Sequence, residues 1–173
     1  MKKTKIIVLD ALLAAIASVI LSLGSLLGDL DLTFAALASV AVFIAIIEIG
    51  LSSAIAVWLA TSLLSGILRP SAAVLMFACF VGLYPIIKLT SERLRPVLAW
   101  TVKIVSANVA TVVITLLSEL VFFPGEGYAW WIYVVMLLLA NAATVMFDYV
   151  LSKFAVLYFS KLRRRIGFKD TKK

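Results

Sequence analysis

Eight ionisable or strongly polar side chains lie within apolar stretches that are long enough to cross a membrane. Such groups are costly in lipid, so each of them is a functional candidate by default. Three lie near the ends of their stretches, where a polar head can reach the headgroup region; these are Asp10, Glu48 and Lys153. The other five are Lys103, Asn108, Glu119, Asn141 and Asp148.

Two amides and two opposite charges occur at matching depths on the last two apolar stretches. Asn108 and Asn141 each lie eleven residues in from the start of their stretch, and the two stretches run in opposite directions. Lys103 and Asp148 lie on the same side of these amides, at depths that agree within about 3 Å for a helical rise of ~1.5 Å per residue. We therefore predict an Asn108–Asn141 hydrogen bond and an intramembrane ion pair between Lys103 and Asp148.

Two roles fit the predicted ion pair. It can fix the register of two helices, or it can take part in a proton or ion relay. Lys103 and Asn108 are about 140° apart around a helix, so one flat interface does not easily hold all four side chains.

A second candidate site combines two acids with a group of aromatic rings. Glu119 and Glu126 are followed by Tyr128, Trp130 and Trp131. Acids and rings gathered at one mouth can bind a small cationic or ring-containing ligand. The same residues also fit an interfacial aromatic belt with a water-facing acid.

A stripe of small residues marks the first apolar stretch. Ala11, Ala15, Ser18 and Ser22 recur at spacings of four, three and four, which places them on one face of a helix. Small side chains at this spacing let another helix approach closely. The stripe predicts either tight packing within the protein or the docking of a partner membrane protein.

The residue types argue against catalysis. The chain has no histidine and one cysteine, Cys79, which excludes a histidine general base, a histidine metal site and an internal disulfide. No glycine-rich phosphate loop, metal-ligand spacing or activated nucleophile is recognisable. We expect no enzymatic activity, no cofactor and no bound metal.

The elements that position these residues follow from composition. The 173 residues are 64% hydrophobic and 14% charged, with a mean hydropathy of +1.15, whereas soluble domains are about 45–50% apolar and about 25% charged. Length and punctuation predict an all-α membrane protein, a single transmembrane domain over 1–173. Its six spans are expected at 5–27, 33–49, 51–68, 71–88, 97–123 and 130–160.

The net charge of +7 gives the expected orientation. In a six-span arrangement, thirteen of the sixteen basic residues fall at the two termini and in the loop after the fourth span, all on one face. This bias predicts that both termini are cytoplasmic, in a multi-pass protein of the cell membrane. Basic clusters beside apolar spans also favour anionic lipid, so we expect the lipid bilayer, and not nucleic acid, as the acidic partner.

The layout resembles the substrate-binding S components of energy-coupling-factor vitamin transporters. The resemblance rests on six short spans, on Ala11-Leu12-Leu13-Ala14-Ala15 in the first span, and on Asp31-Leu32-Thr33-Phe34 before the second. It implies that Ala11 and Ala15 contact a transmembrane coupling subunit that works with ATPases. It also implies a pocket for a small, vitamin-like molecule, with substrate-binding candidates Asn108, Glu119, Tyr128, Trp130, Trp131 and Asn141.

The chain is also similar in size and span number to the rod-shape-determining MreD family. That resemblance implies a membrane scaffold for wall-synthesis proteins, without a ligand. The two families make different demands on the structure. A binding subunit needs a cavity with convergent polar groups, whereas a scaffold needs a packed interior whose polar residues serve helix register.

Overall fold

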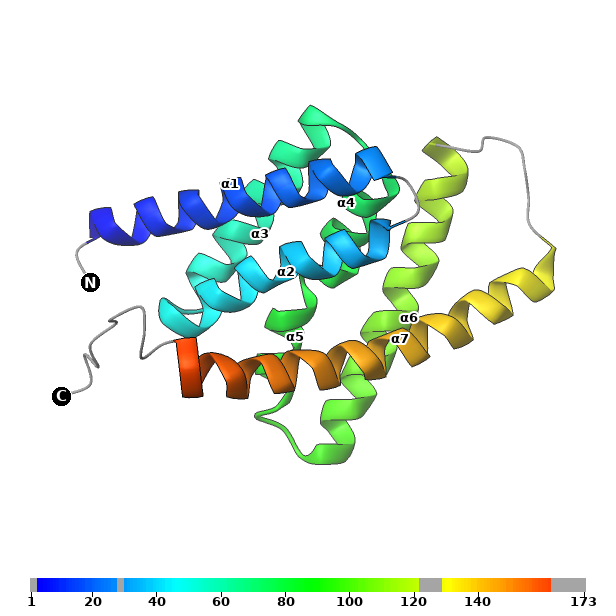
Figure 1. Cartoon of the computed structure of the whole chain (residues 1–173). Helices are drawn as coiled ribbons and strands as arrows, with labels where there is room; N and C mark the ends of the chain where they lie inside the picture. The colour runs from blue at the N-terminus through cyan, green and yellow to red at the C-terminus, as the bar shows by residue number, and fades with distance from the viewer. Residues whose placement is uncertain (1–2, 28–29, 122–128, 163–173) are drawn as a thin grey trace.

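The computed structural model describes residues 3–27, 30–121 and 129–162. Within these ranges every regular element is a helix, and six helices are long and apolar enough to cross a membrane. Figure 1 shows their arrangement, with the start of α1 and the end of α7 on the same side. The elements are α1 (Lys3–Leu27), α2 (Asp31–Glu48), α3 (Leu51–Leu68), a fourth span made of α4 (Ala72–Met76), η1 (Phe77–Val81) and α5 (Tyr84–Ser91), α6 (Pro96–Val121), and α7 (Trp130–Leu157) continued by η2 (Tyr158–Leu162).

The expected boundaries and the observed ones agree closely except in the fourth span. The turn between α2 and α3 is as short as predicted and is centred on Gly50, whose φ of 135° is favourable only for glycine. The fourth span is not interrupted at Pro85. Pro85 lies in the first turn of α5, where the missing N–H breaks no helical hydrogen bond.

The interruption of the fourth span comes earlier, at a π-helical turn. The Gly82 amide donates to the Phe77 carbonyl at 2.8 Å, five residues back. The Trp58 indole from α3 donates to the Ala78 carbonyl at 3.2 Å, which satisfies part of the loosened backbone. A Cβ on Gly82 would lie 2.7 Å from the Phe77 carbonyl oxygen. The turn therefore requires glycine at this position.

The first three helices pack closely through small residues. Ala17, Ala35, Ala38, Ala45 and Ala54 are completely buried among α1, α2 and α3. Gly24 of α1 lies so close to Phe34 of α2 that an added Cβ would come within 2.5 Å of the Phe34 Cβ. Small side chains at the contacts permit this close approach of the helix backbones.

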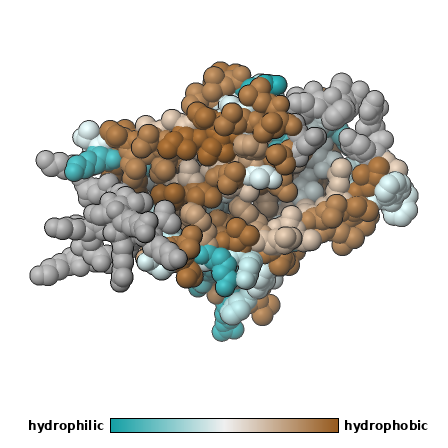
Figure 2. Space-filling view, in the orientation of Figure 1, coloured by the Kyte–Doolittle hydropathy of each residue, from teal (hydrophilic) through white to brown (hydrophobic). Residues whose placement is uncertain are grey.

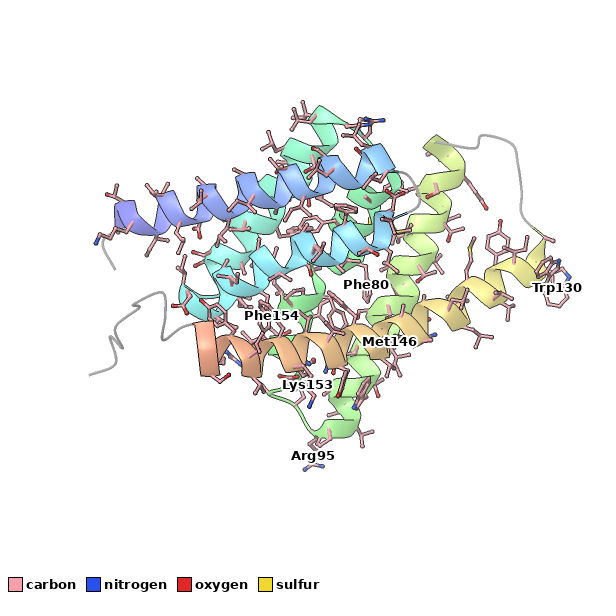
Figure 3. The ribbon with its side chains drawn as sticks, in the orientation of Figure 1. Phe80, Arg95, Trp130, Met146, Lys153 and Phe154 are labelled. Atoms are coloured by element: carbon pink, nitrogen blue, oxygen red, sulfur yellow. The ribbon has the colours of Figure 1, made fainter. Side chains whose placement is uncertain are left out.

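Helix α7 joins this bundle through aromatic side chains along one half of its length. Phe154 packs against Phe43 of α2 with ring centroids 5.9 Å apart, and Phe147 packs against Tyr84 of α5 at 5.2 Å. Figure 3 shows Phe154 in this region and Trp130 at the opposite end of α7, away from the first three helices. We call the end where α5 turns into α6 the lysine end, and the end where α7 begins the tryptophan end.

The surface matches a lipid environment. Many large apolar side chains of α1, α3, α6 and α7 are exposed. Figure 2 shows a nearly continuous hydrophobic surface over α1 and α2. Hydrophilic residues in that view gather mainly at the ends of the helices, including the turn between α5 and α6. The described structure is therefore that of a helical bundle suited to a membrane.

Candidate functional site: a polar seam between α6 and α7

The buried charges gather around one carboxylate at the lysine end. Asp148 Oδ1, on α7, accepts hydrogen bonds from Lys103 Nζ of α6 at 2.7 Å, Lys88 Nζ of α5 at 2.8 Å and the Tyr84 hydroxyl at 2.9 Å. The predicted Lys103–Asp148 ion pair is therefore present in the structure. It is one part of a larger group that joins three helices.

Two further residues complete this group, which we call the Asp148 cluster. Lys88 Nζ also donates to Ser152 Oγ at 2.8 Å and lies 2.9 Å from a carboxylate oxygen of Glu92. The side chains of Lys88 and Lys103 are only 7% and 5% exposed, whereas that of Glu92 is 51% exposed. The cluster thus runs from a buried carboxylate to a carboxylate at the surface of the lysine end.

Lys88 was expected to belong to the loop after the fourth span, because that span was predicted to end at 88, and no role was predicted for Tyr84. The helix in fact continues to Ser91, so Lys88 belongs to a helix face and not to a loop. Tyr84, Lys88 and Glu92 recur every four residues, which aligns them along that face. This spacing is the signal that could have identified them.

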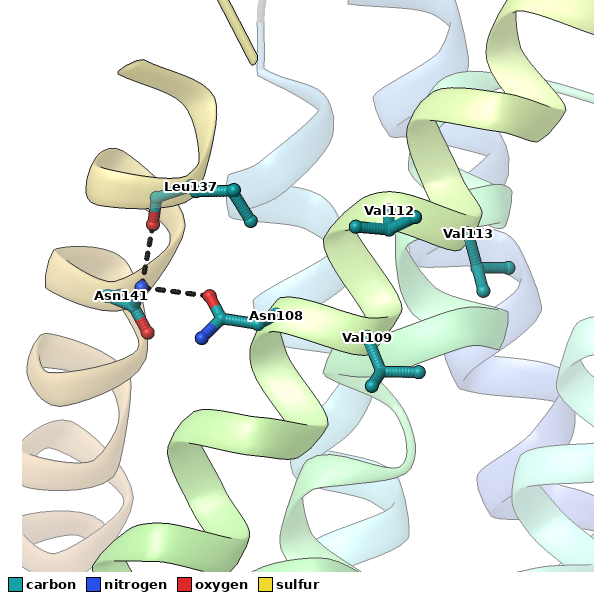
Figure 4. Close-up of a pocket in the computed structure, with 6 residues that line it drawn as sticks. All are labelled: Asn108, Val109, Val112, Val113, Leu137 and Asn141. Atoms are coloured by element: carbon teal, nitrogen blue, oxygen red, sulfur yellow. Dashed lines mark hydrogen bonds between the residues drawn. The ribbon is translucent and has the colours of Figure 1, made fainter. Parts of the chain in front are cut away.

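The predicted amide pair is also present. Asn141 Nδ2 donates to Asn108 Oδ1 at 2.9 Å and to its own helix at the Leu137 carbonyl at 2.8 Å (Figure 4). Asn141 Oδ1, a buried amide oxygen in the middle of the bundle, has no hydrogen-bond partner among the described residues.

The amide pair borders a groove between α6 and α7. Figure 4 shows Asn108 and Asn141 together with Val109, Val112, Val113 and Leu137, which line a space of about 590 Å³. A smaller space of about 120 Å³ adjoins it through Val112 and Leu137, and Thr111, Thr115 and Tyr133 contribute to its wall. The groove therefore extends from the middle of the bundle toward the tryptophan end.

A further polar contact joins α6 and α7 at the tryptophan end. Together with the Asn108–Asn141 and Lys103–Asp148 pairs, it forms what we call the polar seam. The Tyr133 hydroxyl of α7 donates a short hydrogen bond to the Glu119 carboxylate of α6. Asn108, Thr111, Thr115 and Glu119 are spaced three or four residues apart, so they lie along one face of α6. The sequence analysis did not recognise Thr111 and Thr115 as members of this stripe.

Two members of the expected aromatic group near Glu119, Trp130 and Trp131, are largely exposed. Trp130 and Trp131 are 79% and 56% exposed, and Figure 3 shows Trp130 at the tip of α7. Their positions fit an interfacial belt and not the wall of a pocket. Tyr128 and Glu126 lie outside the described residues, as do the basic residues after 162.

The small-residue stripe of α1 is exposed in the first half of the helix and covered in the second half. Ala11 and Ala15 are exposed. Ser18 is 2% exposed and donates to the Ala14 carbonyl of its own helix, and Ser22 is half-buried. Of the four residues predicted to form a partner interface, Ala11 and Ala15 are exposed and could be reached by another helix, whereas Ser18 is covered within the protein.

The remaining polar residues of the spans lie at separate positions. Glu48, at the end of α2, accepts a hydrogen bond of 2.9 Å from the Tyr158 hydroxyl of η2. Lys153 Nζ lies 5.3 Å from the centre of the Tyr149 ring. Asp10 Oδ1 is buried without a hydrogen-bond partner in the part of the chain that the structure describes. These residues do not join the polar seam.

Comparison with known proteins identifies no relative. No family model, no curated protein and no solved structure matches the chain. The polar contacts between α6 and α7 are therefore the basis on which a function can be proposed.

Proposed function

We propose that the protein is a membrane-embedded binding subunit for the uptake of a small, vitamin-like molecule. The observation that carries this proposal is the groove of about 590 Å³ beside the Asn108–Asn141 pair. The groove is open along the α6–α7 surface, where Val109 and Val112 are exposed, and its volume is within the range of about 300–1,000 Å³ of small-molecule sites. An apolar wall with a few polar groups is also the usual composition of such sites.

The polar groups of the groove favour an uncharged, partly polar ligand. The side-chain amides of Asn108 and Asn141 line the groove and can exchange hydrogen bonds with a ligand. The valine and leucine side chains around them provide apolar contact. Glu119 and Tyr133, bonded to each other across the seam, would lie beside the path from the tryptophan end.

Transport by this protein requires a separate, ATPase-coupled partner in our proposal, because the sequence offers no recognisable nucleotide site of its own. The exposed Ala11 and Ala15 on α1 support such a partner, since small outward-facing residues let a second helix approach closely. Under this proposal the lysine end and both termini face the cytoplasm. The described basic residues Lys88, Arg93 and Arg95 lie near that end.

Native mass spectrometry of the detergent-purified protein tests the proposal. We expect a small molecule to be retained by the wild-type protein and lost from Asn141→Leu, which removes one of the two amides that line the groove. Met146→Leu is the matched control, because Met146 lies on the same helix and is largely exposed. An empty wild-type protein, or a molecule retained equally by both variants, would contradict a site in the groove.

A scaffold of the MreD type is the second candidate, and one observation favours it. Asn108 and Asn141 bond to each other, and so do Glu119 and Tyr133, as expected of polar residues that serve helix register. A scaffold would be isolated without a small molecule and with bound partner proteins. The same mass-spectrometry experiment therefore separates the two candidates.

A further inference from the structure

The Asp148 cluster contains two buried ammonium groups around a single buried carboxylate. Lys88 and Lys103 both contact Asp148 Oδ1, at 2.8 and 2.7 Å. The fourth charge, Glu92, balances the second lysine from a half-exposed position at the lysine end. Because buried charges require compensation, the position of the Glu92 carboxylate is one at which a negative charge is needed.

The hydrogen-bonding capacity of Lys103 is not filled by the protein. An ammonium group carries three donors, and Lys103 makes one hydrogen bond to the residues that the structure describes, to Asp148. Its distance of 3.7 Å to Glu92 is too long for a second one. The Trp100 ring, whose centre is 5.1 Å from Lys103 Nζ, supplies only a cation–π contact.

Glu92 is weakly held in this position. It pairs with Lys88 across one turn of α5 and is 51% exposed. Because the Glu92 side chain is half exposed, its carboxylate can turn toward water when a stronger anion takes its place beside Lys88. Arg93 and Arg95 are exposed on the adjoining turn, and they add positive charge close to Glu92 in the sequence.

We propose that Lys88 and Lys103 form a binding site for a phosphate group, with the Glu92 carboxylate as an internal ligand that the phosphate displaces. A phosphate oxygen at the Glu92 position could accept from Lys88 and from the unfilled donors of Lys103. The phosphate can belong to a lipid headgroup or be free in solution. This site lies at the lysine end and is independent of the groove between α6 and α7.

Binding measurements on three single variants test the site. The probes are dioctanoyl phosphatidylglycerol and inorganic phosphate, each titrated into the detergent-purified protein. Glu92→Gln removes the competing carboxylate, and we expect about fivefold tighter binding, while Lys103→Gln should weaken binding about fivefold or more, on the scale of ~1 kcal/mol per charge at a membrane surface. Lys153→Gln is the matched control, because it removes the same charge from α7 outside the cluster.

The outcomes show which source of phosphate binds and whether the proposed site exists. Binding of the lipid alone assigns a headgroup site, and binding of inorganic phosphate assigns a site for free phosphate. The proposed phosphate site is refuted if Glu92→Gln leaves the affinity for both probes unchanged. It is also refuted if Lys153→Gln weakens binding as much as Lys103→Gln. If Lys103→Gln fails to fold, Glu92→Gln decides alone, because its side chain is half exposed.

Discussion

The first three helices and the α6–α7 pair are held together in opposite ways. Helices α1, α2 and α3 meet through buried alanines and through Gly24, with few polar contacts between them. Helices α6 and α7 meet through polar contacts at three levels, centred on Asp148, on Asn141 and on Tyr133. Space remains between these contacts, and the groove occupies it.

This difference shows where a membrane bundle can accommodate a ligand. Close packing of small residues excludes any other molecule from the contact. Directional hydrogen bonds between larger side chains hold two helices at fixed levels while leaving the intervening surfaces apart. The α6–α7 pair therefore combines a defined geometry with an open groove, and the first three helices provide the stable body against which it is held.

The largest loss of stability is expected when Asp148 is neutralised. Asp148→Asn leaves Lys88 and Lys103 buried without their shared carboxylate, and breaking a buried pair in this way costs about 3–5 kcal/mol. Thermal unfolding in detergent, followed by circular dichroism, measures the effect. Lys153→Gln on the same helix should change the free energy of unfolding by less than about 0.5 kcal/mol. Equal stability of the two variants would show that the cluster does not hold α5, α6 and α7 together.

The close packing of the first three helices is tested at Gly24. Gly24→Ala places a Cβ 2.5 Å from the Phe34 Cβ, and overpacking of this kind costs about 1–3 kcal/mol. Gly66→Ala in α3 is the matched control, because nothing lies within 4 Å of its added Cβ. That change should instead stabilise the helix by up to about 1 kcal/mol. The sign of the two changes in melting temperature is therefore expected to differ, and two changes of the same sign would argue against the close approach of α1 and α2.

Much of the α6–α7 seam could be predicted from the sequence because depth in a membrane follows directly from residue number. The 1.5 Å rise of a helix places Lys103 opposite Asp148 and Asn108 opposite Asn141, and both contacts are present. The spans were likewise evident from hydropathy and length. These inferences use one dimension only, the position along the helix axis.

The four-residue spacing of Tyr84, Lys88 and Glu92 is visible in the sequence, but the partners of that helix face are not. The fourth span breaks at Phe77–Val81 and resumes as α5, which continues past the expected end of the span at 88. Lys88 therefore lies on a helix and joins the Asp148 cluster. The rings of Trp130 and Trp131 stay outside the site because the α7 segment that carries them extends away from the bundle (Figure 1). Helix breaks and crossing angles arise from packing between distant segments, and no local pattern in this sequence specifies them.

The smallest expected effect comes from the polar contact at the tryptophan end. Tyr133→Phe removes the hydroxyl that donates to Glu119, and hydrogen bonds between membrane helices contribute about 0.6 kcal/mol on average. Tyr149→Phe is the control, because Tyr149 lies on the same helix and is largely exposed. Unfolding in detergent should detect a small loss for Tyr133→Phe and none for Tyr149→Phe. A loss as large as that of Asp148→Asn would mean that α6 and α7 are held as firmly at the tryptophan end as at the lysine end. The groove would then lie between two strong contacts, and not between the strong Asp148 cluster and the weak Tyr133–Glu119 contact.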